Sequence, residues 1–279
     1  MSSIELKDIS KTYGPRQVLE HVSLCVEEGE FVSIVGTSSS GKTTLLKIAS
    51  GLEKPSAGLV SIGGQGVEGF PRGASIVFQN YSLLPWLSAI ENVRLAVENA
   101  FPEWPRAKQK DQSAQYLQMV GLSGALSKRP SQLSGGMRQR VAIARAFAVE
   151  PRILFLDEPF GALDALTRAT LQQELARLCD AQNPRATVLM ITNSVDEAIL
   201  LSDRILALGR DGSRGGSSLT AAAPVMLPRP RAADLLLHDE EAVRVRARVT
   251  DLLTSGRSEQ LAHARSGKSA VRRAVPVEA

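Results

Sequence analysis

The sequence predicts an α/β fold with a core of parallel strands, an antiparallel β region at the N-terminus and an inserted α-helical subdomain. Short apolar runs alternate with helical patterns along the 279-residue chain, as they do in parallel α/β domains. Two runs near the start alternate apolar and polar residues, as strands with one solvated face do. A long middle stretch has helical patterns and no convincing strand.

The predicted strands explain the first two parts of this fold. Residues 4–9 and 18–26 alternate in polarity and are expected to form the antiparallel region. Residues 31–35 are nearly all apolar, which is typical of a buried central strand. Residues 153–156 and 187–191 are similar runs, and we expect them to join the same parallel core.

Helices are expected over residues 42–49, 88–100, 106–120 and 136–148. The first follows a predicted core strand directly. The other three have no strand between them, and we interpret them as a helical subdomain of about residues 80–148 inserted in the core.

The end of the chain differs in composition. After residue 208 the sequence reads GRDGSRGGSS, which is typical of a flexible linker. We therefore expect a main domain of residues 1–208, a linker of residues 209–238 and a C-terminal part of residues 239–279. This last part contains one predicted helix, 239–254, and a basic tail that is expected to be disordered.

Composition excludes several classes of protein. Hydrophobic residues make up 43% of the chain and its formal net charge is +4, so a full core can form and no dense basic run indicates nucleic acid. The start, MSSIELKD, lacks the basic and apolar regions of a signal peptide. Cys25 and Cys179 match neither a disulfide framework nor a metal site. We expect a soluble, cytosolic protein.

A phosphate-binding loop is the first chemical motif. Residues 36–43 read Gly-Thr-Ser-Ser-Ser-Gly-Lys-Thr and match the pattern G-x-x-x-x-G-K-[ST] between a strand and a helix. The helix N-terminus attracts phosphates, Lys42 adds a positive charge, and the Thr43 hydroxyl can ligate Mg²⁺. The predicted ligands are ATP and Mg²⁺. The expected contacts are Gly36, Thr37, Ser38, Ser39, Ser40, Gly41, Lys42, Thr43 and Thr44.

A second motif supplies carboxylates. The apolar run 153–156 ends in Asp157 and Glu158, at the edge of the sheet where α/β proteins bind ligands. Asp157 can hold Mg²⁺ through water, and Glu158 can polarise the attacking water. A solvated acidic turn is the alternative for Asp-Glu alone, and the phosphate loop earlier in the chain favours the catalytic interpretation.

Residues 133–140, Leu-Ser-Gly-Gly-Met-Arg-Gln-Arg, resemble the signature of ABC transporter ATP-binding subunits, which have a P-loop NTPase (RecA-like) fold. Ser134, Gly135 and Gly136 precede a helix and make a second anion site with nothing of its own to bind. The resemblance implies that this site closes on the γ-phosphate held by a partner, so we expect a homodimer or heterodimer of ATPase subunits. Ser134 is also well placed as a helix N-cap.

Other family elements follow in the expected order. The resemblance implies that Tyr13 stacks on adenine, that Gln79 senses Mg²⁺ and contacts the permease, and that Asp164 links the two sites of a dimer. The expected metal-site residues are therefore Thr43, Gln79 and Asp157.

Three residues depart from the family pattern. Asn193 and Ser194 stand where the family usually has His and Asp, and Ser39 stands where it commonly has Gly. Asn193 can donate a hydrogen bond to the γ-phosphate but cannot carry a proton. Ser39 is expected to strain a turn that needs an unusual φ. The expected catalytic residues are Glu158, Asn193 and Gln79, with turnover reduced by these departures.

Within the family, residues 80–86 and 158–167 resemble the nitrate, sulfonate and bicarbonate importers, and residues 96–106 and 227–231 are most similar to the nitrate branch. Residues 81–86 are expected to lie beside the groove that receives a permease helix, or else to form a local core.

The resemblance implies an ATPase subunit that energises uptake of a small anion: nitrate first, with sulfonate, taurine or bicarbonate as alternatives. Its expected partners are permease subunits, a second ATPase and, indirectly, a periplasmic binding protein, at the cytoplasmic face of the inner membrane and without nucleic acid. Two other functions stay open. One is a weakly hydrolysing regulatory ATPase of such a transporter, and the other is a soluble ABC ATPase that acts on nucleic acid or ribosomes.

Overall fold

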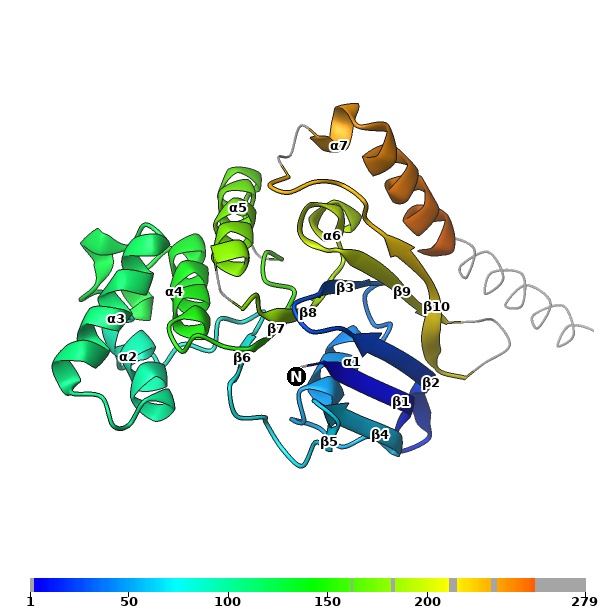
Figure 1. Cartoon of the computed structure of the whole chain (residues 1–279), viewed down its shortest axis with the longest axis horizontal. Coiled ribbons are helices and arrows are strands. Elements are labelled where there is room, and N and C mark those ends of the chain that lie inside the picture. The colour runs from blue at the N-terminus through cyan, green and yellow to red at the C-terminus, as the bar shows by residue number, and fades with distance from the viewer. Residues whose placement is uncertain (1–2, 162, 182–183, 211–214, 232–234, 254–279) are drawn as a thin grey trace, which may run out of the picture.

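The computed structural model describes residues 3–161, 163–181, 184–210, 215–231 and 235–253. Within these residues one ten-stranded sheet has the order β5-β4-β1-β2-β10-β9-β3-β8-β7-β6 (Figure 1). The strands are β1 (Ile4–Tyr13), β2 (Arg16–Val26), β3 (Phe31–Val35), β4 (Ala57–Ile62), β5 (Gln65–Gly66), β6 (Ala74–Val77), β7 (Ile153–Asp157), β8 (Thr187–Thr192), β9 (Arg204–Arg210) and β10 (Ser217–Pro224). The α-helices are α1 (Lys42–Ala49), α2 (Ala89–Ala100), α3 (Arg106–Met119), α4 (Gly135–Phe147), α5 (Ala165–Ala181), α6 (Val195–Leu201) and α7 (Leu235–His238), and residues 240–253 are also helical.

The sheet has a parallel part and an antiparallel part. Strands β9, β3, β8, β7 and β6 run parallel to their neighbours in that order. Strands β1, β2, β4 and β5 pair antiparallel beside them. The predicted α/β class, with an N-terminal antiparallel region and a parallel core, is confirmed.

Side chains point alternately to the two faces of the parallel sheet along its strands, and both faces are packed. In β7, Leu154 and Leu156 pack in the apolar cluster that contains α4, α5 and α6. Ile153 and Phe155 face the other way, toward α1 and the antiparallel strands. Because both faces are covered, the core strands are mostly apolar, and the charged side chains lie where the strands begin or end.

Helices α2, α3 and α4 form a subdomain next to the edge strand β6 (Figure 1). Their bounds agree with the predicted helices to within one residue at each end. A capping box fixes the start of α2, where the Ser88 N–H donates to the Glu91 carboxylate over 2.8 Å. Helix α4 begins at the N-cap Ser134, whose hydroxyl accepts a hydrogen bond from the Met137 N–H over 3.3 Å.

The predicted linker of residues 209–238 is wrong. Strand β9 continues to Arg210, and β10 returns antiparallel beside it from Ser217 to Pro224. The Gly- and Ser-rich sequence is compatible with a hairpin because Gly-rich connections join antiparallel strands readily. Residues 211–214 lie outside the described residues, as does the basic tail, 254–279, for which the sequence predicts disorder.

The C-terminal helix occupies residues 240–253, close to the predicted 239–254, and it packs on the domain. Its Ala242, Val245 and Val249 are buried in the same cluster as Ala198 and Leu201 of α6. Strands β4, β5, β6 and β9 and helices α5, α6 and α7 were not predicted.

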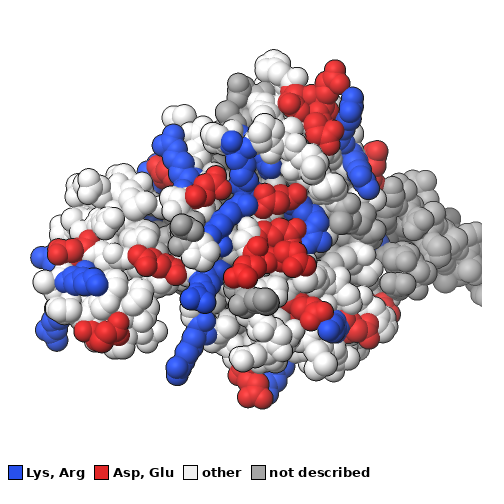
Figure 2. Space-filling model, in the orientation of Figure 1, with Lys and Arg blue, Asp and Glu red and all other residues white. Residues whose placement is uncertain are grey.

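The described part of the chain contains no helix with the length and hydrophobicity needed to span a membrane. On the face shown in Figure 2, acidic and basic side chains are interspersed.

Candidate functional site

The phosphate loop lies between β3 and α1, as predicted. Its first glycine is required sterically, since a Cβ on Gly36 would lie 2.5 Å from the Leu208 carbonyl oxygen. Gly41 has a φ of +92°, and a Cβ at this position would lie 2.9 Å from Val18 Cγ1, so glycine is needed there too. Ser39 adopts a φ of +72°, and the strain predicted at this residue is confirmed.

The loop also holds an unsatisfied group. The buried Ser40 hydroxyl has no hydrogen-bond partner among the described residues. The first N–H groups of α1 have no carbonyl partners within the helix, as at every helix start. A loop with spare donors at a helix N-terminus fits a bound phosphate chain.

Lys42 is 4% exposed, and all three of its N–H donors make hydrogen bonds. Its ammonium group donates to the carbonyl oxygens of Gly36 and Thr37, over 3.1 and 3.0 Å, and to Asn193 Oδ1 over 2.8 Å. Burial lowers the pKa of Lys42, and the charges of Glu158 and Asp157 oppose that shift. The ammonium is therefore held facing the loop.

Asp157 ends β7 beside Thr43, the second residue of α1. The Thr43 hydroxyl donates to Asp157 Oδ1 over 3.3 Å, and Asp157 is 6% exposed. Burial raises the pKa of the Asp157 carboxyl, and the Thr43 hydrogen bond partly offsets the shift. A hydroxyl and one carboxylate are a donor set that suits Mg²⁺ together with phosphate oxygens and water. Among the described residues no cluster of three or more His, Cys, Asp or Glu could hold a metal ion without such help.

Glu158 is held by side chains from two other segments. Asn193 Nδ2 donates to Glu158 Oε1 over 2.6 Å, and Gln79 Nε2 donates to Oε2 over 3.2 Å. The backbone of Glu158 is also fixed, since its N–H donates to the Ile191 carbonyl over 2.9 Å and its φ is +43°. The predicted catalytic residues Glu158, Asn193 and Gln79 are thus in direct contact.

Asn193 joins the two charged groups of the site. Its amide oxygen accepts from Lys42 while its amide nitrogen donates to Glu158. The orientation of the amide follows from its partners, because an ammonium can only donate and a carboxylate only accepts. A neutral side chain therefore bridges Lys42 and Glu158, whose charged atoms are 3.9 Å apart.

Tyr13 stands at the opposite end of the site, at the end of β1. Its hydroxyl hydrogen-bonds to the Glu53 carboxylate, and the Lys11 ammonium lies 4.9 Å from the centroid of its ring. These contacts fix the ring, which lines an open pocket of about 700 Å³. The pocket is lined by Tyr13, Arg16, Val18, Ser38, Ser39, Gly41, Lys42, Thr43, Thr44, Gln79, Glu158 and Asn193.

Sequence reasoning missed Arg16 and Val18 in this pocket. The feature that could have indicated them is their position at the start of β2, directly after the turn that follows Tyr13. Seven predicted contacts do not line the pocket: Gly36, Thr37 and Ser40 of the phosphate loop itself, and Ser134, Gly135, Gly136 and Asp164 from other segments. Gly136 instead packs on α5, where a Cβ would come 2.5 Å from Thr167 Cγ2.

A buried carboxylate beside the site was also missed. Glu197, 5% exposed, accepts a hydrogen bond from the Thr192 hydroxyl over 2.6 Å, and burial raises its pKa. Arg168 lies 3.8 Å from Glu197 and donates to the Leu163 carbonyl over 3.0 Å. The first turn of α6 is thereby connected to the segment that carries Asp164.

Comparisons with known proteins agree with this arrangement. Residues 19–161 match the family model described as ABC transporter. The chain is 42% identical, over 90% of its length and 88% of the relative's, to the bicarbonate transport ATP-binding protein CmpD of Synechocystis sp.. It is also 42% identical, over 88% of its length and 89% of the relative's, to the nitrate import ATP-binding protein NrtD of Synechococcus elongatus.

A solved structure is similar as well. The ATP-binding cassette MJ0796, in a dimeric post-hydrolysis state bound to ADP and Pi, is 32% identical with a TM-score of 0.68. The match covers 81% of this chain and 100% of that one.

The raised pKa of Asp157 yields a test of the metal site. Because the folded protein binds this proton more tightly than the unfolded chain, ionised Asp157 destabilises the ligand-free fold at pH above the ordinary range of the group. We expect Asp157→Asn to raise the Tm at neutral pH by about 2 °C or more, with the gain vanishing in acid. Thermal unfolding with and without Mg²⁺ and ATP measures both effects.

The same variant should lose the additional stabilisation that Mg²⁺ gives in the presence of ATP. The exposed Asp111→Asn is the matched control and should leave both values unchanged. A lower Tm for ligand-free Asp157→Asn, or full stabilisation by Mg²⁺, would contradict the assignment.

Proposed function

The chain belongs to the ABC transporter family of ATP-binding proteins, and from this we propose that it is the ATP-hydrolysing subunit of an importer for a small inorganic anion. The observation that carries the proposal is the contact of Lys42, Asn193 and Glu158 at the edge of the sheet, beside the phosphate loop. These groups bind phosphate, sense it and position water within one hydrogen-bonded set.

Lys42 binds the β- and γ-phosphates in this proposal. All three of its donors are already occupied by Gly36, Thr37 and Asn193, so a phosphate oxygen must replace at least one acceptor. Asn193 is the acceptor that belongs to a different segment. Phosphate binding would therefore change the contacts of Asn193, which can then donate to the γ-phosphate or to Glu158.

Glu158 positions the attacking water. Both of its carboxylate oxygens accept a hydrogen bond, one from Asn193 and one from Gln79, which fixes the plane of the group. A carboxylate in a fixed orientation can accept a hydrogen bond from water and take up its proton as the bond to phosphorus forms.

Thr43 and Asp157 would hold Mg²⁺, with Gln79 close to the same edge. The bound ion would neutralise charge on the phosphates. The desolvated Asp157 supports this role, because a buried carboxylate without a cation is unfavourable.

A second ATPase subunit would complete the site. Ser134, Gly135 and Gly136 start α4 outside the ATP pocket of their own chain, so they are free to meet the γ-phosphate of a partner. The similar cassette is a dimer in its structure. Asp164 lies at the start of α5, away from the same pocket, and would contact the partner as well.

A permease would bind near residues 81–86. The carbonyls of Tyr81 and Ser82 accept from the Arg145 guanidinium over 2.9 and 2.6 Å, which fixes this segment to α4. Trp86 is nevertheless 64% exposed. A local core does not account for Trp86, although Tyr81 and Leu83 pack against the main cluster.

The transported anion is proposed from the relatives. CmpD and NrtD, whose names give bicarbonate and nitrate, are equally similar to this chain at 42% identity. We keep nitrate as the first candidate and bicarbonate as the alternative, with the subunit peripheral at the cytoplasmic face of the membrane. The relatives favour transport over a soluble ATPase that acts on nucleic acid. The next experiment tests the remaining alternative function, a weakly hydrolysing regulatory subunit.

We expect Glu158→Gln to lower kcat for ATP at least about 100-fold while ATP binding is retained, because the amide keeps the shape of the carboxylate without its basicity. The amide has one acceptor oxygen, so it keeps only one of the two bonds from Asn193 and Gln79. The variant should accumulate as an ATP-bound dimer in size-exclusion chromatography. The exposed Glu98→Gln serves as control. Hydrolysis at the wild-type rate would show that Glu158 is not the water-positioning residue.

We expect Trp86→Ala to keep the ATPase activity of the purified subunit and to lose association with its permease, because the exposed indole makes no core contact that folding requires. Leu59→Ala removes another exposed apolar side chain, 72% exposed, from β4 and should leave association unchanged. Co-purification from detergent-solubilised membranes measures the difference. A Trp86→Ala chain that aggregates, or that co-purifies normally, would count against the proposed groove.

A further inference from the structure

The segment Leu227-Pro228-Arg229-Pro230-Arg231 follows β10 and makes contacts that the ATP site does not explain. The segment crosses the ends of α5 and α6 that lie farthest from the site (Figure 1). We call residues 227–231 the arginine segment.

Arg231 uses all of its guanidinium donors within the fold. Its Nη1 donates to the carbonyls of Ile199 and Ser202 over 2.7 and 2.6 Å. Its Nε and Nη2 donate to Leu227 over 3.1 and 2.9 Å, and Nη2 also donates to Val225 over 3.2 Å. Ile199 and Ser202 lie at the C-terminal end of α6, where carbonyls lack helical partners and a cation is favourable.

Arg231 is only 9% exposed, and burial lowers its pKa to about 10. It therefore remains charged at neutral pH, and the five bonds to carbonyl oxygens compensate for the loss of water.

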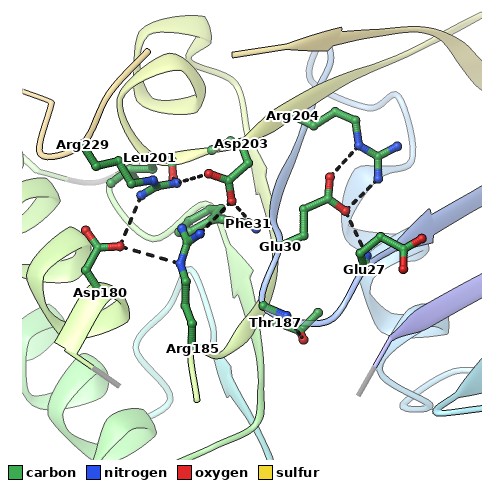
Figure 3. A network of polar contacts seen from close by, with 12 residues as sticks. Glu27, Glu30, Phe31, Asp180, Arg185, Thr187, Leu201, Asp203, Arg204 and Arg229 are labelled. Atoms are coloured by element: carbon green, nitrogen blue, oxygen red, sulfur yellow. Dashed lines mark hydrogen bonds and ion pairs between the residues drawn. The ribbon is translucent and has the colours of Figure 1, made fainter. Parts of the chain in front are cut away.

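Arg229 ties the same region to two other elements. Its Nη2 donates to the Leu201 carbonyl over 2.5 Å and to Asp203 Oδ1 over 2.8 Å, and its Nη1 lies 3.7 Å from Asp180 near the end of α5 (Figure 3). Asp203 also accepts from the N–H of Phe31, the first residue of β3, over 2.9 Å. Arg229 thus connects the ends of α5 and α6 with the start of the strand that leads to the phosphate loop.

The opposite ends of the same two helices lie beside the site, since Arg168 of α5 and Glu197 of α6 line a pocket together with Glu158 and Asn193. Helix α6 begins two residues after Asn193, and α5 begins directly after Asp164. Here the helices are joined by Arg168 and Glu197, 3.8 Å apart. Helix α6 has seven residues, a length of about 10 Å, so a contact at its far end is one short rigid element away from Asn193.

The C-terminal helix adds a further contact to α6. Arg246 Nε donates to Asp196 Oδ1, in the first turn of α6, over 2.8 Å. A helix of two turns is unstable alone, so its position depends on its contacts with other elements, both these polar ones and the apolar packing of Ala198 and Leu201.

We propose that Arg229 and Arg231 are positioning residues for ATP hydrolysis, which hold α6 so that Asn193 reaches both Lys42 and Glu158. The inference rests on the function proposed above for these three residues. It assigns a role in hydrolysis to a part of the chain that does not contact the nucleotide pocket.

The test replaces Arg231 with lysine in the full chain. An ammonium has three donors and no planar fork, so it cannot replace all five bonds that Arg231 makes to carbonyl oxygens. We expect Arg231→Lys to lower kcat about 10-fold or more, because small displacements of catalytic groups are costly, and to change KM for ATP less than about 2-fold. The control is Arg244→Lys, on the exposed side of the C-terminal helix.

A double variant separates positioning from general destabilisation. In an Asn193→Ala background, Arg231→Lys should change kcat less than about 2-fold, because the group it positions is gone. An unchanged kcat in the single variant, or an equal loss in both backgrounds, would overturn the proposal.

If Arg231→Lys does not fold, Arg229→Gln provides the same comparison at the other residue of the proposal, because it removes the charge that pairs with Asp180 and Asp203. We expect kcat to fall about 3-fold, and this loss should again disappear in the Asn193→Ala background. An equal loss of kcat in both backgrounds would overturn the proposal. A wild-type chain without ATPase activity would instead refute the proposed function itself.

Discussion

The amide of Asn193, bonded to Lys42 on one side and Glu158 on the other, is the contact on which the rest of the site depends. The topology of the sheet makes it possible. Strand β8 lies between β3 and β7, so the residue after β8 stands between the loop after β3 and the carboxylates after β7. Because the strands are parallel, all three side chains emerge at one edge.

This arrangement has an energetic cost in the absence of nucleotide. Lys42 and Asp157 are both buried. Burial lowers the pKa of Lys42 and raises the pKa of Asp157, so it disfavours the charged form of each group. Ser39 is held at a positive φ, and the Ser40 hydroxyl has no partner within the described residues. Phosphate would compensate the buried charge of Lys42 and the unpaired Ser40 hydroxyl, and a cation would compensate the buried charge of Asp157. The site is therefore organised for a ligand at the expense of the stability of the empty fold.

The sequence predicted the strands that end at the site and the residues that follow them, because buried parallel strands and phosphate loops have strong local patterns. It did not predict that β8 is central, since strand order depends on long-range packing. Strand β10 was mistaken for a linker because the sequence before it is rich in Gly and Ser, which is also typical of a linker. The roles of Arg231 and Glu197 were invisible for a similar reason: their partners are backbone carbonyls and side chains distant in sequence.

The most direct test of this account is the steady-state kcat of Asn193→Asp in the purified protein. Aspartate has the shape of asparagine and still accepts from Lys42, but it cannot donate to Glu158 and places a second negative charge beside it. The account predicts a kcat lower by about 100-fold, with folding and ATP binding retained. A kcat equal to that of the wild type would contradict it, since the bridge between Lys42 and Glu158 would then have no part in hydrolysis.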